Sequence, residues 1–101
     1  MPKIELKIPH SLTQSEALTR IQKVLPELRA KHSDKISDLE ESWVGYTGSY
    51  KFTVSGFRVS GTVAVEPSYV LIKGDLPFLA MAFKSKIVDT IREQAEALLK
   101  K

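Results

Sequence analysis

Between Ile36 and Lys73 the hydrophobic pattern has a period of two residues, and this alternation constrains the fold more than any other feature. Alternating apolar and polar side chains are typical of β-strands with one buried face. Turn residues, mostly glycine, proline and serine, separate four such segments. We therefore predict four antiparallel strands, at roughly Ser37–Val44, Ser49–Ser55, Arg58–Glu66 and Tyr69–Gly74.

The N-terminal third predicts one more strand followed by a helix. Lys3–Ile8 alternates in the same way, and Pro9 ends the pattern. Thr13 then begins a helix, since Glu16 three residues later completes a capping box. Pro26 lies inside this helix and removes a backbone hydrogen bond, so we expect a bend there. A hinge or a pocket lining at Pro26 is the functional alternative.

The C-terminal stretch from Gly74 to Lys101 predicts one long helix. Asp75 is a suitable N-cap, because its carboxylate can accept hydrogen bonds from the first-turn amides. Pro77 follows in the first turn, where a missing N–H costs little. Beyond Lys84 the apolar residues form a single helical stripe.

The predicted element order is β-α-β-β-β-β-α, which indicates an α+β fold. We expect an antiparallel five-stranded sheet packed by a long C-terminal helix and an N-terminal helix. This is a reduced, helix-grip-like two-layer sandwich. We place the first strand beside the last, in the order 2-3-4-5-1. A length of 101 residues suits one domain over residues 1–101.

Composition excludes several classes of protein. The absence of cysteine rules out disulfides and thiolate chemistry. No apolar run is long enough to span a bilayer, and the N-terminus does not have the pattern of a signal peptide. Cytoplasm is therefore the default expectation. No metal-ligand spacing or phosphate-binding loop is present, so we expect no metal and no cofactor.

The first candidate site is an apolar run at the start of the predicted terminal helix. It contains Phe78, Leu79, Met81 and Phe83. A helix that is apolar all round cannot be covered by one sheet alone. Three interpretations stay open: burial under the sheet and first helix, an exposed patch that binds a partner, or the lining of an apolar ligand cavity.

Two further candidates come from the strand pattern and the histidines. Val44, Tyr69 and Leu71 put apolar bulk on the outer face of the sheet, which predicts either a dimer contact or a local bulge that shifts the register. His10 lies at the strand-to-helix corner, where a local hydrogen bond is the simplest role. It is also the polar group we name for a ligand cavity. No catalytic residue is assigned.

Nucleic-acid binding is not favoured. The net charge of +3 is modest, and the only basic cluster is Arg29, Lys31 and Lys35. Gly45 to Gly48 matches the GxxG letters of a KH domain, but that loop must join two helices to clamp a nucleic-acid backbone. Here predicted strands flank it, so we interpret it as a hairpin turn.

Several motifs match a known family. They are Pro9–Leu12 (PHSL), Trp43, the Gly56 and Gly61 pair, and Gly74–Phe78 (GDLPF) followed by Phe83. Over essentially its whole length the chain resembles the bacterial family named "putative polyhydroxyalkanoic acid system protein". The resemblance implies a cytoplasmic protein linked to storage-polyester granules, and it brings no catalytic residues.

We therefore expect a non-catalytic accessory or binding module that presents the apolar run to a polyhydroxyalkanoate granule, an acyl-type ligand or another protein. The alternatives are a homodimeric acyl-binding protein and an enzyme with a cavity between the sheet and the C-terminal helix.

Overall fold

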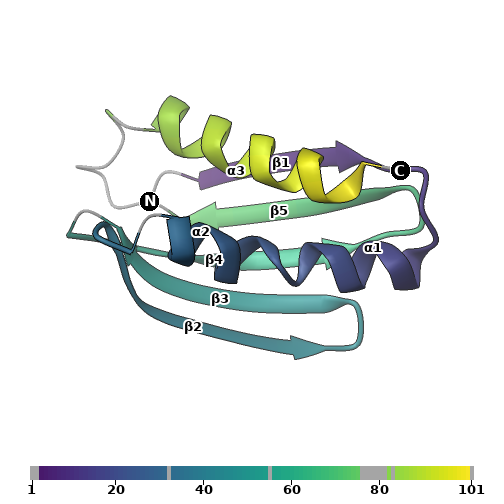
Figure 1. Ribbon diagram of the computed structural model, residues 1–101, viewed down its shortest axis with the longest axis horizontal. Helices are drawn as coiled ribbons and strands as arrows, with labels where there is room; N and C mark the ends of the chain where they lie inside the picture. The colour runs from purple at the N-terminus through teal and green to yellow at the C-terminus, as the bar shows by residue number, and fades with distance from the viewer. Residues whose placement is uncertain (1–2, 32, 55, 76–81, 83, 101) are drawn as a thin grey trace.

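In the computed structural model the described residues are 3–31, 33–54, 56–75, 82 and 84–100. They form a sheet with helices on one of its faces (Figure 1). Along the chain the elements are β1 (Lys3–Pro9), α1 (Gln14–Ile21), α2 (Val24–Lys31), β2 (Ile36–Val44), β3 (Thr47–Val54), β4 (Phe57–Val65), β5 (Tyr69–Asp75) and α3 (Lys84–Leu99). The predicted α+β class is confirmed.

The five strands are antiparallel throughout and follow the order β1-β5-β4-β3-β2. This is the strand order that the sequence predicted. β4 is the central strand, whereas β1 and β2 are the two edges. The first strand, β1, forms one edge of the sheet and pairs with β5, with Ile4 opposite Gly74 and Ile8 opposite Val70.

The helix-covered face of the sheet holds the core. Directly paired residues of antiparallel strands share a face, and the buried positions follow that rule from β1 to β3. Helices α1, α2 and α3 add their apolar sides to it. The buried strand residues are Ile4, Leu6, Ile8, Tyr50, Phe52, Val59, Val65, Val70 and Ile72.

The N-terminal helix is divided into two. Thr13 caps α1, and its hydroxyl accepts from the Glu16 amide at 3.1 Å, as predicted. The helical ladder stops at Gln22 and Lys23 and starts again in α2. Pro26 has no N–H to donate to the Gln22 carbonyl, so the break falls one turn before the proline. A single bent helix was therefore too simple a prediction.

The start of the terminal helix was predicted wrongly. Asp75 is the last residue of β5, where it pairs with Lys3 of β1 and Ser60 of β4. Strand pairing on both sides outweighs its propensity to cap a helix. Helix α3 begins at Lys84. The four residues of the apolar run, Phe78, Leu79, Met81 and Phe83, lie outside the described part of the chain.

The predicted four-residue turn after β2 is shorter than expected. Gly45 and Tyr46 form the turn, and Thr47 already pairs with Val44. Gly45 has a φ of 60°, which suits the first central position of a two-residue hairpin loop. A β-bulge between Ser37 and Glu40 contains Asp38 at a φ of 54°. This bulge lies at the start of β2, whereas Val44, Tyr69 and Leu71, for which a bulge was one interpretation, pair in regular register.

Candidate functional site

The face of the sheet opposite the helices is open in the described part of the chain (Figure 1). Three rows of side chains cross it from β1 to β2. The first row carries alternating charges and the second is rich in hydroxyls. The third row is the most apolar. In order from β1 to β2 the rows are Lys3, Asp75, Ser60, Lys51, Glu40; then Glu5, Lys73, Thr62, Ser49, Ser42; then Lys7, Leu71, Ala64, Thr47, Val44.

A hollow of about 510 Å³ lies over the first two rows. Serine and threonine side chains provide its floor because they are short. The longer side chains of Glu40, Lys51 and Asp75 border it. In the part of the chain that the structure describes, no ion pair occupies these charged groups, since the only one found joins Arg20 to Glu16. The open face therefore presents unpaired charges of both signs around a polar floor.

The residues predicted for a dimer contact lie at one end of this open face. Val44 is 81% exposed, and Leu71 is half-buried in the same row. Tyr69 lies one step beyond Leu71 on β5, and the Lys7 ammonium lies 4.3 Å from the centre of its ring. The three residues therefore lie at the same end of the open face, with Ala64 and Thr47 between Leu71 and Val44.

Tyr50 lies beneath the hollow, on the helix-covered side. Its hydroxyl donates to the Lys73 carbonyl at 2.8 Å. Gly61 and Gly74 leave room for this hydroxyl, because a Cβ at Gly61 would lie 2.6 Å from it and 2.0 Å from the Lys73 oxygen. Burial, with a smaller contribution from the negative charge of Asp75, raises the pKa of Tyr50 to about 12. Tyr50 therefore stays protonated and acts as a structural donor.

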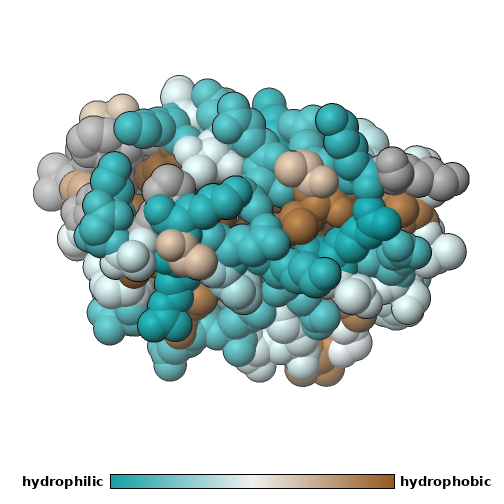
Figure 2. All heavy atoms as spheres, viewed as in Figure 1, coloured by the Kyte–Doolittle hydropathy of each residue, from teal (hydrophilic) through white to brown (hydrophobic). Residues whose placement is uncertain are grey.

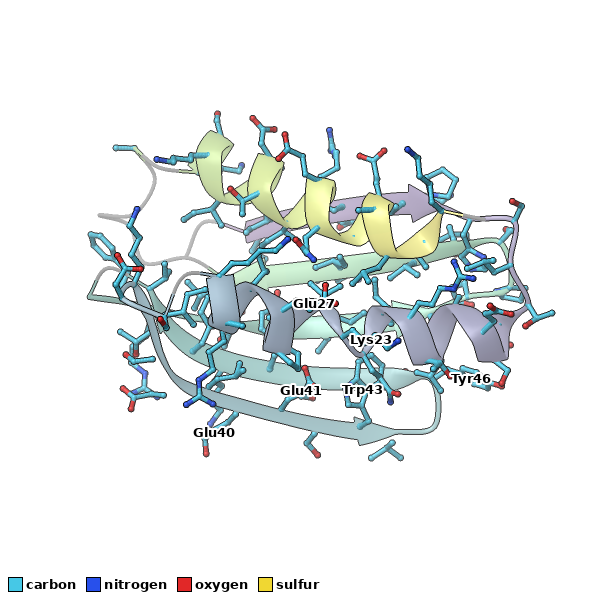
Figure 3. The ribbon with its side chains drawn as sticks, viewed as in Figure 1. Lys23, Glu27, Glu40, Glu41, Trp43 and Tyr46 are labelled. Carbon is cyan, nitrogen blue, oxygen red and sulfur yellow. The ribbon has the colours of Figure 1, made fainter. Side chains whose placement is uncertain are left out.

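Trp43 packs inward from the edge strand β2, across Gly48 of β3. Its Nε1 is buried and has no hydrogen-bond partner among the described residues. A cavity of about 30 Å³ lies beside it, under α2, with Glu41 at its border (Figure 3). Small-molecule pockets typically measure about 300–1,000 Å³. The geometry therefore gives no support to an acyl-binding cavity between these described elements.

His10 makes one local hydrogen bond, of the kind that the sequence predicted, and a second to a distant part of the chain. Its Nδ1 accepts from the Leu12 amide at 3.1 Å, and its Nε2 lies 2.9 Å from the Glu66 carbonyl. This pattern requires the tautomer that carries its proton on Nε2. Both ring nitrogens are thus engaged with backbone groups that hold the β1–α1 corner against the β4–β5 turn.

The basic residues Arg29, Lys31 and Lys35 are exposed around the end of α2. Lys31 donates to the Gln94 side chain at 3.0 Å, and Gln94 donates to Glu27 at 2.6 Å. These contacts tie α2 to α3, so part of the cluster has a structural role. The surface around the helices is mostly hydrophilic, with apolar side chains visible in the seam between α1 and α3 (Figure 2).

The described residues contain no group of acidic or histidine side chains that could hold a metal ion. Nor is any helix among them long and apolar enough to cross a membrane.

The charged first row was missed in the sequence. The alternation of apolar and polar residues correctly predicted that Lys51 points away from the core. The strand order was also predicted correctly. Asp75, however, was assigned to a helix cap, and the bulge in β2 shifts Glu40 to the open face. This row could have been predicted only by aligning the residues of all four strand pairs in their registers.

Fold and surface together define a two-layer α+β module with one helix-covered and one open sheet face. The model of the family described as "Putative polyhydroxyalkanoic acid system protein (PHA_gran_rgn)" matches residues 4–99. The chain therefore belongs to this family, as the sequence motifs suggested.

Comparison with solved structures finds TTHA0849 from Thermus thermophilus, at 13% sequence identity and a TM-score of 0.37. The alignment covers 97% of this chain and 92% of that one. A search of curated proteins gives no match.

Proposed function

We propose that the chain is a non-catalytic binding module of the polyhydroxyalkanoate system in the bacterial cytoplasm. It attaches to the granule surface, or to a protein on that surface, through the apolar run Phe78, Leu79, Met81 and Phe83. Membership of the polyhydroxyalkanoic acid system family supports the link to this machinery.

One observation supports the apolar run as the binding surface: in the sequence it is a wholly apolar stretch between strand β5 and helix α3. Residues 76–83 (LPFLAMAF) contain no charged or hydrogen-bonding side chain. Asp75 immediately before them is paired on both sides in the sheet, and Lys84 after them begins α3. Such a wholly apolar connection suits contact with a polyester or with an apolar protein surface, because burial removes apolar area from water.

A non-catalytic role agrees with the groups that the structure brings together. His10 is committed to two backbone partners, and Tyr50 is held protonated by burial. Within the described part of the chain, the hydrogen bonds of both groups go to the backbone and to no nucleophile or second titratable side chain. A general acid or base needs such a partner in reach.

The test is co-sedimentation of the purified protein with isolated polyester granules. We compare wild type with Met81→Asp and Leu79→Asp, and far-UV circular dichroism establishes that each variant is folded. Val44→Asp is the matched control, because it adds the same charge at an exposed position on another part of the molecule. We expect a tenfold or greater loss of binding for a folded variant of the apolar run and none for the control.

Equal granule binding by wild type and both folded variants would overturn the assignment of the apolar run. Binding by none of the proteins would overturn attachment to the polyester itself. Unfolding of both variants would place the apolar run in the core and contradict its role as a surface.

A further inference from the structure

The open face of the sheet has a charge pattern that is complementary to itself. The first row reads positive, negative, neutral, positive, negative from β1 to β2: Lys3, Asp75, Ser60, Lys51, Glu40. Reversing the order of this row turns every charge into its opposite. We propose that a second copy of this chain packs on the open face, related by a two-fold axis that runs along the central strand β4.

This axis follows from the strand order. Rotation about β4 places β5 of one copy over β3 of the other, and β1 over β2. Asp75 then faces Lys51 of the second copy, and Lys3 faces Glu40. Because the interface is isologous, each pairing occurs twice. The interface therefore contains four contacts between opposite charges. None of the four groups has an ion-pair partner within the described part of its own chain.

The other two rows fit the same axis. In the second row Lys73 faces Ser49 and Glu5 faces Ser42, so each charge meets a hydroxyl. In the third row Ala64 lies on Ala64, Leu71 lies beside Thr47, and Lys7 lies over Val44. A two-fold axis perpendicular to the strands would instead place the charged row over Val44 and Leu71. The distribution of charge therefore selects one axis.

The hollow on the open face has room for the charged side chains of a second copy. Its floor consists of short hydroxyl side chains, and its volume is about 510 Å³. Packed sheets cross at about −30°, which displaces facing residues more the farther they lie from the axis. Asp75 and Lys51 lie on the strands next to β4, so their contact is displaced least. The contact between Lys3 and Glu40, on the edge strands, relies on the length of both side chains.

Two features oppose this arrangement, and the first is the position of Lys7 over the apolar Val44. The second is Arg58, which lies on β4 near its start, on the open face, and so faces Arg58 of the second copy. This repulsion, together with the small apolar content of the face, predicts weak association. The face spans five strands spaced about 4.8 Å apart and about 24 Å of strand length, or roughly 500–600 Å² per copy. That area is at the lower limit for specific interfaces.

The experiment is sedimentation equilibrium at low salt and at protein concentrations up to about 1 mM, the range of weak association. Lys51→Glu and Asp75→Lys each place like charges opposite one another twice, so we expect the dissociation constant to rise at least tenfold. The double variant restores opposite charges and should return to within about threefold of wild type. Glu40→Lys and Lys3→Glu form a second, independent set with the same expected pattern and a smaller effect.

Two further variants test the geometry. Lys86→Glu makes the same charge change on α3, away from the open face, and should leave the dissociation constant unchanged. Arg58→Ser removes the repulsion on the axis and should tighten association. Circular dichroism checks the fold of every variant, and two charge-swap sets keep the test valid if one variant unfolds.

A wild type that stays monomeric at the highest concentration would overturn the proposal. So would a double variant that behaves like its parents, or single variants that associate as well as wild type. None of these results depends on granule binding, because the apolar run is unchanged in every protein of the series.

Discussion

The two faces of the sheet are made by the same strands and have opposite characters. On the helix-covered face, Val59, Val65 and Val70 are at most 1% exposed. On the open face, the neighbouring positions carry hydroxyls and charges that no ion pair occupies in the described chain. The difference indicates that one face provides stability, whereas the other is available for contacts outside the domain.

The largest expected effect comes from placing the same charge at adjacent residues of β5, one on each face of the sheet. This pair of variants tests whether the two faces differ as described. Val70→Asp buries a carboxylate without a partner and should cost more than about 4 kcal/mol, which is enough to unfold a domain of this size. Leu71→Asp lies on the open face and should cost less than about 1 kcal/mol. Urea denaturation followed by circular dichroism measures both. Similar losses for the two variants would contradict the assignment of faces.

The buried hydroxyl of Tyr50 should make stability depend on alkaline pH. Its pKa of about 12 in the folded chain exceeds the ordinary value of 10.0, so the folded state keeps its proton where the unfolded state loses it. The stabilisation is complete below pH 10 and is lost as the pH rises from 10 to 12. Two pKa units correspond to on the order of 2–3 kcal/mol.

The measurement for Tyr50 is the free energy of unfolding against pH, for wild type and Tyr50→Phe. The difference between the two profiles isolates Tyr50 from the lysines that titrate in the same range. Parallel profiles would show that the phenol is not protected by burial.

Gly61 should tolerate no side chain, although it lies among half-exposed residues of β4. A Cβ there would lie 2.0 Å from the Lys73 carbonyl and 2.6 Å from the Tyr50 hydroxyl. We expect Gly61→Ala to cost about 1–3 kcal/mol, the usual range for overpacking. Thr62→Ala, next along β4 and on the open face, is the control and should be close to neutral. Thermal unfolding of the two variants distinguishes them.

The smallest predicted effect is at the cap of α1. Thr13→Ala removes the hydrogen bond from the Glu16 amide and should cost about 1 kcal/mol. Thr13→Ser keeps an acceptor and should restore most of that loss. A neutral alanine variant in thermal unfolding would mean that water replaces the cap at this exposed position.

Local patterns in the sequence predicted most of this fold. Alternation is a local signal, so it located the strands and identified Tyr50 and Phe52 as core residues. Asp75 was assigned wrongly because its neighbours Lys3 and Ser60 come from distant parts of the chain. The bulge at Asp38 and the acceptor of His10, which is 56 residues away, are equally nonlocal. The charged row across five strands depends on four registers at once, and its recognition required all of them.

The central claim is that the open face is a contact surface while the helix-covered side is not. It is tested most directly by lysine acetylation followed by mass spectrometry, at low and at high protein concentration. We predict that the labelling rate of Lys51 on the open face falls as concentration rises, whereas that of Lys23 between α1 and α2 stays constant. Equal rates for Lys51 at both concentrations, or equal protection of Lys23, would contradict the account.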